Sequence, residues 1–372
     1  MPIKRTSAAG NAALLALRSM IAPMVAVAIA LIVGGALVIA LGDNPVEVYG
    51  TIVQGSLVGW PNFLVTLQTM TPLLFTGLAV AVAFRAGLWN IGAEGQLIMG
   101  ALCSGIVGYA VELPRFIHLP LCLIAAMLGG AIWGLIPAVL RVKFRVNELV
   151  VCLMMNPIAL LLSGWIAARV LKAPGPTNKL PDVLDSAGLT NFSVYSQVNA
   201  GFVIGLFLCI LFAFINLRTK IGFQWRMIGL NPRFANYGGM QVERKALSVF
   251  LISAAIAGLG GAEQVLGQYH AFYDNFSPGY GFDGIAVAML AGNNPIGVIL
   301  AALLFGALNS GGVVLQMMTG LSKYLVQVLQ FIIVLILSAR FSWEWLKAQR
   351  VSVVEPQPQA EALPKNAETQ EN

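Results

Sequence analysis

The sequence carries very little charge for its length. Only 10% of its 372 residues are Asp, Glu, Lys or Arg, whereas 58% are hydrophobic. Soluble domains have about 25% charged residues, so this composition excludes an ordinary soluble protein. Histidine and cysteine are also scarce, with two and four residues. The cysteines lie in apolar stretches without a C-x-x-C pair, so we expect neither a disulfide framework nor a Cys- or His-based metal site.

Sequence motifs of nucleotide hydrolysis are missing too. No G-x-x-x-x-G-K-[S/T] loop occurs, and nothing resembles a Ser-His-Asp triad. We therefore expect that the chain is not an enzyme and binds no cofactor or metal itself. The net charge of +6 follows from the membrane topology described below and requires no nucleic-acid partner.

Long apolar runs dominate the chain instead. A helix needs about 20 apolar residues to cross a membrane core of roughly 30 Å. Suitable runs lie near 20–41, 62–84, 92–111, 117–140, 149–171, 200–217, 246–267 and 321–339. A further region is interrupted by AGNNPIG, so residues 281–290 are predicted as a half helix before a helix over 295–311. The sequence predicts an all-α polytopic membrane protein with about ten transmembrane helices.

The basic residues give this protein an orientation. If ten segments alternate from a cytoplasmic N-terminus, 17 of the 22 Lys and Arg residues fall on the cytoplasmic side, as the positive-inside rule expects. Both termini are then cytoplasmic. We divide the chain into an N-terminal arm (1–19), a transmembrane domain (20–340) surrounded by membrane lipid, and a largely disordered tail (341–372), which is rich in Pro, Gln and Glu.

A short motif recurs in the two halves of the chain. GAEG at 92–95 and GFDG at 281–284 each open an apolar segment. Under the ten-segment topology they enter the membrane from opposite sides. Two four-segment units of opposite orientation are typical of inverted-repeat transporters, whose broken helices line the pathway.

The stretch GLWNIGAEGQLIMGA, residues 87–101, places polar groups within this apolar region. Its glycines permit an unwound backbone, which is tolerated at membrane depth only where protein or a water-filled cavity surrounds it. A lipid-facing Glu94 would cost about 2.5–3.5 kcal/mol, so it should face inward. Alternatively, Asn90 caps the next helix, with Glu94 near its positive end; Asp283 has the same two interpretations. The predicted substrate pathway comprises Trp89, Asn90, Glu94, Gln96, Asn156, Phe282 and Asp283.

The longest cytoplasmic loop, 218–245, contains signals for a helix of its own. Asn231 is suited to the N-cap, Pro232 to the first helical position, and Gly238–Gly239 to termination. The sequence predicts a short helix along the cytoplasmic face, where another protein could act on it. The alternative is a solvated loop with an incidental helical turn.

Four stretches together resemble a known family. GLWNIGAEGQLIMGA, VNELVVCLMMNPIALLL, MIGLNPRFANYGGM and GFDGIAVAMLAGNNPIGVILAALLFGAL are similar to permease subunits of bacterial ABC importers in the branched-chain amino acid and ribose permease superfamily. The nucleoside and simple-sugar branch is the nearest. The resemblance covers roughly residues 60–340 and excludes both ends of the chain.

This resemblance implies a type II ABC importer permease fold in the bacterial inner membrane. It also implies a second permease subunit, homologous or identical, ATP-binding subunits that hydrolyse the ATP, and an extracytoplasmic substrate-binding protein. The segment around 229–240 matches the coupling-helix region that docks on the ATPase. The residues expected to serve coupling are Arg226, Gly229, Asn231, Pro232, Arg233, Phe234 and Tyr237.

The substrate is predicted mainly from the resemblance. Nucleosides are flat, amphipathic and uncharged, so aromatic surfaces and amides along the pathway suit them. Simple sugars would use similar groups, and branched-chain amino acids are a further alternative. A self-sufficient secondary transporter with Glu94, Glu148 and Asp283 as a cation relay is the alternative outside the ABC class.

Overall fold

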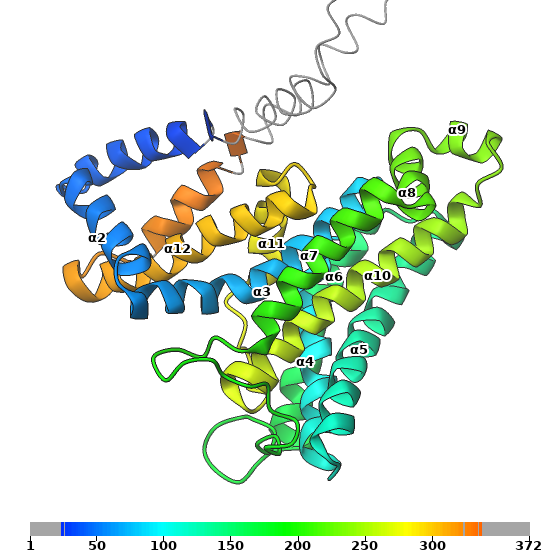
Figure 1. Cartoon of the computed structure of the whole chain (residues 1–372), viewed down its shortest axis with the longest axis horizontal. Coiled ribbons are helices and arrows are strands. Elements are labelled where there is room, and N and C mark those ends of the chain that lie inside the picture. The colour runs from blue at the N-terminus through cyan, green and yellow to red at the C-terminus, as the bar shows by residue number, and fades with distance from the viewer. Residues whose placement is uncertain (1–23, 26, 323, 334, 337–372) are drawn as a thin grey trace, which may run out of the picture.

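The computed structural model describes residues 24–336 except 26, 323 and 334, and most of them are helical (Figure 1). The predicted arm 1–19 and tail 341–372 lie outside the described residues. The helices are Val27–Ala40, α2 (Pro45–Leu57), α3 (Trp60–Arg85), α4 (Ala93–Ala110), α5 (Arg115–Phe144), α6 (Glu148–Trp165), α7 (Ala200–Arg218), α8 (Lys220–Leu230), α9 (Pro232–Tyr237), α10 (Val242–Glu263), α11 (Tyr280–Leu290), α12 (Pro295–Thr319) and Tyr324–Ile333. Single π-helical stretches, Ile166–Val170 and Gln264–Tyr269, continue α6 and α10.

Several of these helices can span a membrane. Six are long and apolar enough, and the number rises to seven if the bent pair Val27–Ala40 and α2 is one span. The chain is therefore a multi-pass membrane protein. The predicted half helix is confirmed as α11, which has 11 residues. The full count of ten spans stays a prediction, because helices such as α4 and α11 are not among the six.

Two helices were not predicted from the sequence. α2 follows the first span after a bend of 119°, and its start carries ordinary signals, because Asn44 caps it and Pro45 occupies the first turn. α8 begins at its cap, Thr219. Both helices are short and lie outside the long apolar runs, so a search for membrane spans overlooks them.

In the predicted two-unit arrangement, the first unit begins with α3 and the second with α10. α3 lies against α11 and α12, and α10 lies against α4 and α5. α3 and α10 also contact each other. The opening helix of each unit therefore packs on the helix that carries the Gly-x-acid-Gly motif of the other.

Glycine lets the backbones of α4, α5 and α10 approach closely. A Cβ atom at Gly258 of α10 would lie 2.3 Å from the carbonyl oxygen of Ala126 in α5, and one at Gly261 would lie 2.1 Å from that of Leu97 in α4. In a membrane the hydrophobic effect does not drive helices together, because lipid tails are as apolar as the helices. Close packing at small residues drives their association instead. The sequence GLGG at 258–261 thus fixes α10 between its two neighbours.

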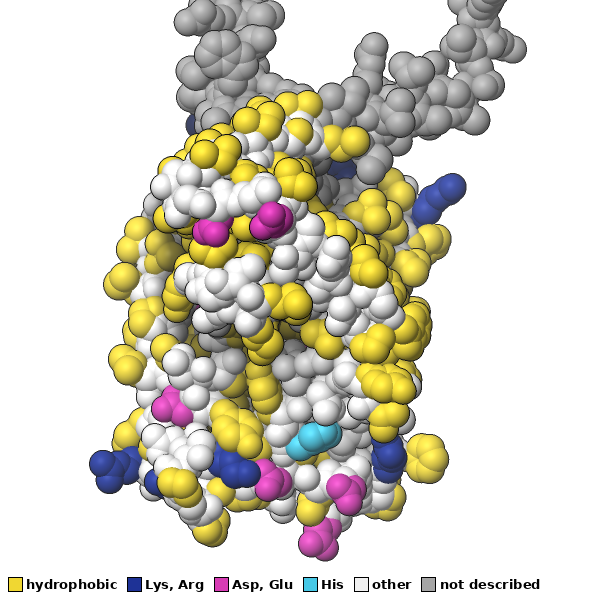
Figure 2. Space-filling view, turned by 90° about the vertical axis from the view of Figure 1, so that its left-hand side faces the viewer, with side chains coloured by type: hydrophobic (Ala, Val, Ile, Leu, Met, Phe, Trp, Pro, Cys, Tyr) yellow, Lys and Arg dark blue, Asp and Glu magenta, His cyan; other side chains and the backbone are white. Residues whose placement is uncertain are grey.

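The two ends of the helical bundle differ. α8 and α9 project from one end, and the long irregular segment 171–199 lies at the other (Figure 1). Figure 2 shows charged side chains gathered at the end with the irregular loops, below a face that is mostly hydrophobic or uncharged. On this face, the bundle has a polar end at the irregular loops and an apolar middle.

Candidate functional site

The loop 86–92 joins α3 to α4 and turns back into the bundle. Gly87 has a φ of +73°, a left-handed conformation that favours glycine. Beyond it, the side chains of Leu88 and Asn90 are buried. The predicted unwound backbone is therefore present, and it is enclosed by protein as its polar groups require.

Asn90 is the centre of this loop's hydrogen bonds. Its Nδ2 donates to Gln96 Oε1 and to Ser253 Oγ, both at 2.8 Å, and its Oδ1 accepts from Gln96 Nε2 at 2.9 Å. Ser253 Oγ in turn donates to the carbonyl oxygen of Ala79 in α3 at 2.6 Å. Asn90 thus ties together α3, α4 and α10.

The alternative that Asn90 caps α4 is wrong. The residue before α4 is Gly92, and α4 has no side-chain cap. Because residues 91 and 92 form a turn, Asn90 lies too far back to cap the helix. It accepts instead from the Gly92 N–H at 3.2 Å.

Asn156 of α6 supports the same loop from the other side. Its Oδ1 accepts from the Gly95 N–H and its Nδ2 donates to the Ile91 carbonyl, both at 3.0 Å. Asn90, Gln96 and Asn156, here called the amide cluster, are all buried. The structure therefore brings together three of the seven predicted pathway residues, and it uses them to hold the start of α4.

Glu94 joins the two halves of the chain. Its Oε2 accepts a hydrogen bond of 2.5 Å from the Gly281 N–H at the start of α11. A Cβ atom at Gly281 would lie 2.2 Å from the Glu94 nitrogen, so only glycine fits there. The two Gly-x-acid-Gly motifs are thus in direct contact, and the carboxylate lies where the positive ends of two helices meet. We call this contact the α4–α11 junction.

Asp283 belongs to a separate polar group. It accepts from Asn309 Nδ2 of α12 at 3.2 Å, and Asn309 Oδ1 accepts from Gln330 Nε2 at 2.8 Å. Asp283 is half-buried. The sequence offers no means of pairing it with Asn309 and Gln330, because these residues lie on other helices and share no local pattern with it.

The two predicted aromatic residues are the accessible members of the set. Trp89 and Phe282 are each 45% exposed. The Trp89 ring lies against Phe84, with 4.8 Å between ring centroids. The backbone N–H of Trp89 donates to Glu148 Oε1 at 3.4 Å. The predicted residues therefore fall into three groups. The amide cluster and Glu94 are buried and hold the backbone, Asp283 belongs to a separate polar group, and Trp89 and Phe282 offer exposed aromatic surface.

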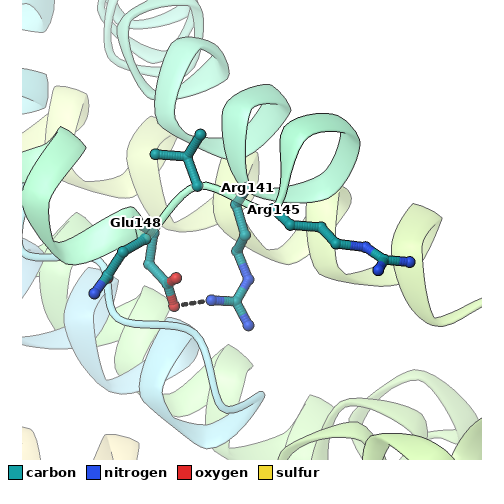
Figure 3. A pocket seen from close by; sticks show the side chains of 5 residues that line it. Arg141, Arg145 and Glu148 are labelled. Atoms are coloured by element: carbon teal, nitrogen blue, oxygen red, sulfur yellow. Dashed lines mark ion pairs between the residues drawn. The ribbon is translucent and has the colours of Figure 1, made fainter.

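Glu148 lies at the turn between α5 and α6 and does not contact the other two acids of the predicted relay. It forms an ion pair with Arg141, beside a shallow pocket that Arg145 also lines (Figure 3). The ion pair with Arg141 and the hydrogen bond from the Trp89 backbone hold this carboxylate in place, which suits an anchor for the loop better than a carrier of cations.

The predicted short helix in the loop 218–245 is confirmed as α9. Asn231 Oδ1 accepts from the Phe234 N–H at 3.0 Å, Pro232 is its first residue, and Gly238 follows its last. Phe234 is 60% and Tyr237 91% exposed, whereas α8 buries Trp225 and Ile228. Arg226 is half-buried and Arg233 exposed. α8 thus packs on the bundle through Trp225 and Ile228 and carries an α9 whose aromatic rings are exposed.

Comparison with known proteins now adds to this geometry. Residues 62–338 match the family described as "Branched-chain amino acid transport system / permease component". The chain belongs to this family. No solved structure matches it.

Three relatives cover most of the chain. A guanosine ABC transporter permease of Bacillus subtilis is 36% identical over 88% of this chain and 95% of its own length. A glucose ABC transporter permease of Haloferax volcanii is 34% identical over 89% of both chains. A nucleoside ABC transporter permease of Lactococcus lactis is 32% identical over 79% of this chain and 84% of its own. The protein is thus a permease of the ABC transporter type.

Proposed function

We propose that this permease forms the translocation pathway for nucleosides in an ATP-driven importer. Two of the three relatives described above are named for guanosine or nucleosides. The structural observation that carries the proposal is the α4–α11 junction, where the two Gly-x-acid-Gly motifs meet through Glu94 and Gly281. Junctions of broken helices are where transporters place their pathways.

The side chains near this junction suit an uncharged, amphipathic substrate. Trp89 and Phe282 present partly exposed rings, on which a nucleobase can stack. The amide cluster holds the backbone beside them, and amides exchange hydrogen bonds with bases and sugars alike. Trp89, Asn90, Glu94, Gln96, Asn156, Phe282 and Asp283 remain our proposed pathway residues.

A simple sugar is the second candidate substrate. The glucose permease of Haloferax volcanii is almost as similar to this chain as the guanosine permease. A sugar also stacks on aromatic rings and bonds to amides, so the described side chains suit both. The family's printed description names branched-chain amino acids, which need partners for two charges.

We assign the partner proteins to the two ends of the bundle. We place the ATP-binding subunits at α8 and α9, where Arg226, Gly229, Asn231, Pro232, Arg233, Phe234 and Tyr237 form the docking region. The extracytoplasmic binding protein approaches the opposite end, and a second permease completes the pathway. ATP is used by the ATPase partner, and this chain binds no cofactor. Membership of an ABC permease family removes the main support for a self-sufficient secondary transporter.

The arrangement also supports the inverted repeat, and we propose ten segments in all. The reciprocal contacts of α3 with α11 and α12, and of α10 with α4 and α5, are those that two similar units related by a two-fold axis would make. With α8 and α9 cytoplasmic, both termini lie in the cytoplasm of a bacterial cell whose inner membrane holds the complex.

A competition experiment tests the substrate. Cells that express the complete importer take up labelled guanosine, and unlabelled uridine, glucose or leucine is added in excess. We expect guanosine and related nucleosides to compete and glucose and leucine to have no effect. Uptake of labelled glucose that nucleosides do not inhibit would overturn the nucleoside assignment in favour of the sugar.

A further inference from the structure

One backbone contact joins the coupling region to the loop of the pathway. Gly229 lies in the last turn of α8, and a Cβ atom there would lie 2.3 Å from the carbonyl oxygen of Arg85 and 3.1 Å from the carbonyl carbon of Ala86. A Cβ atom at Gly87 would in turn lie 3.2 Å from Gly229 Cα. The two chain segments therefore touch backbone to backbone, with no side chain between them.

Rigid structure lies on both sides of this contact. α8 is fixed to the bundle by Trp225, which stacks on Phe212 of α7, and by the buried Ile228. Only Asn231 separates α8 from α9, and it is the C-cap of the first and the N-cap of the second. Because a single residue connects the two helices, a displacement of α9 also displaces the end of α8 that contains Gly229.

The other side of the contact leads to the junction of the two units. Gly87 is followed by Trp89 and Asn90, and the amide cluster connects this loop to the start of α4. Arg85, on which Gly229 rests, also reaches the second unit, because its Nη1 donates to the Asn293 carbonyl in the turn between α11 and α12 at 3.4 Å. One small contact thus touches the segment before α4 and the segment after α11.

We propose that Gly87 and Gly229 form the joint through which movement of α8 and α9 reaches the pathway loop 86–92. Close-packed interfaces transmit displacement because they switch between discrete arrangements and do not deform smoothly. Glycine is needed on both sides, since any side chain would separate the two backbones. The joint rests on the proposed function, because it assumes that an ATPase acts on α9.

The test uses the full importer, with its ATPase and binding protein, and a readout that needs no knowledge of the substrate. Trp89→Cys places a thiol on the accessible part of the loop. Its labelling by a maleimide is compared without nucleotide and after trapping of the ATPase with ATP and vanadate. The same complex without the introduced cysteine corrects for native thiols.

The decisive variant is Gly229→Ala in this background, and Gly238→Ala in the same loop is its control. A Cβ atom at Gly238 makes only ordinary contacts of 3.4 and 3.5 Å. We expect the nucleotide-dependent change in labelling to persist in Gly238→Ala and to fall about tenfold in Gly229→Ala, the scale of typical coupling between sites. ATP hydrolysis and co-purification of the ATPase should survive in Gly238→Ala, and co-purification shows whether Gly229→Ala assembles.

Gly87→Asn changes the other side of the same contact. It tests the joint independently if Gly229→Ala does not assemble. Asparagine tolerates a positive φ better than most residues, so this change adds a Cβ atom with little backbone strain. A full labelling change in either assembled variant, or none in the parent complex, would overturn the joint. Failure of the nucleoside assignment would show separately, as absence of nucleoside uptake by the unmodified importer.

Discussion

At the scale of single residues, the polar groups in the bundle act mainly on backbone. Asn90, Asn156 and Glu94 each bond to at least one main-chain N–H of the segment 92–95 or 281. Unwound backbone in a membrane leaves amide groups without helical partners, and each unsatisfied group costs several kcal/mol. The polar side chains at 87–101 therefore serve first to satisfy the non-helical backbone between α3 and α4, and the pathway is formed around that segment.

Replacement of Glu94 tests this role. In Glu94→Ala the buried Gly281 N–H loses its acceptor, which costs about 1–3 kcal/mol, so we expect uptake to fall at least several-fold while the complex still assembles. Glu94→Gln keeps an acceptor oxygen and should retain more activity. Glu112→Ala, which removes an exposed carboxylate beyond the other end of α4, is the control. Asp283→Ala should also lower uptake, and unaltered transport in both alanine variants would remove these acids from the pathway.

At this scale the sequence predicts which residues matter better than what they contact. Glu94 and Asp283 occupy the same position of a shared motif, which suggests similar surroundings. Glu94 nevertheless accepts a hydrogen bond from the Gly281 backbone, whereas Asp283 accepts one from the Asn309 side chain. Ser253 completes the bonds of Asn90 from 163 residues away. Long-range partners of this kind carry no local pattern, so they emerge only when the helices are placed in space.

At the scale of elements, α9 is the clearest case of local signals that determine a structure. Its cap, its proline and its terminal glycine all lie within the eight residues 231–238, and the helix begins and ends as they predict. Most long spans likewise end within a few residues of the predicted bounds, but α12 continues to Thr319, well past the predicted end at residue 311. The bend before α2 and the reciprocal packing of α3 and α10 depend on contacts between distant segments, and therefore could not be predicted.

The exposed ring of Phe234 offers a direct test of α9. Phe234→Asp should uncouple ATP hydrolysis from transport or release the ATPase, because an unpaired charge buried at a contact costs about 3–5 kcal/mol. Phe234→Leu keeps an apolar contact and is the matched control. Co-purification and coupled hydrolysis are measured for both. An aspartate variant that transports normally, with a loop that proteases still cut in the assembled complex, would exclude α9 as the coupling helix.

The close approach of α10 to α5 gives a stability prediction. Gly258→Ala places a Cβ atom against the Ala126 carbonyl, and such overpacking typically costs about 1–3 kcal/mol. Gly50→Ala in α2, where nothing lies within 4 Å, should be neutral or slightly stabilising. Thermal unfolding of the purified proteins in detergent compares them. Equal midpoints would show that the contact at Gly258 relaxes without loss of stability.

At the scale of the whole molecule, the account requires the two ends of the bundle to face different compartments. Val194 in the segment 171–199 and Tyr237 in α9 are both highly exposed. In intact cells a membrane-impermeant maleimide should label Val194→Cys and spare Tyr237→Cys, with the reverse in inverted vesicles. Labelling of both residues from one side would contradict the orientation and with it the cytoplasmic termini.

The central claim is that this permease carries nucleosides inward when an ATPase drives it. The most direct measurement is uptake of labelled guanosine by proteoliposomes that contain the permease, its ATPase and its binding protein, with ATP supplied on the ATPase side. We predict accumulation that requires ATP and all three components and that excess uridine, but not glucose, reduces. Uptake that persists without ATP or without the ATPase, or accumulation of glucose but no nucleoside, would contradict the account.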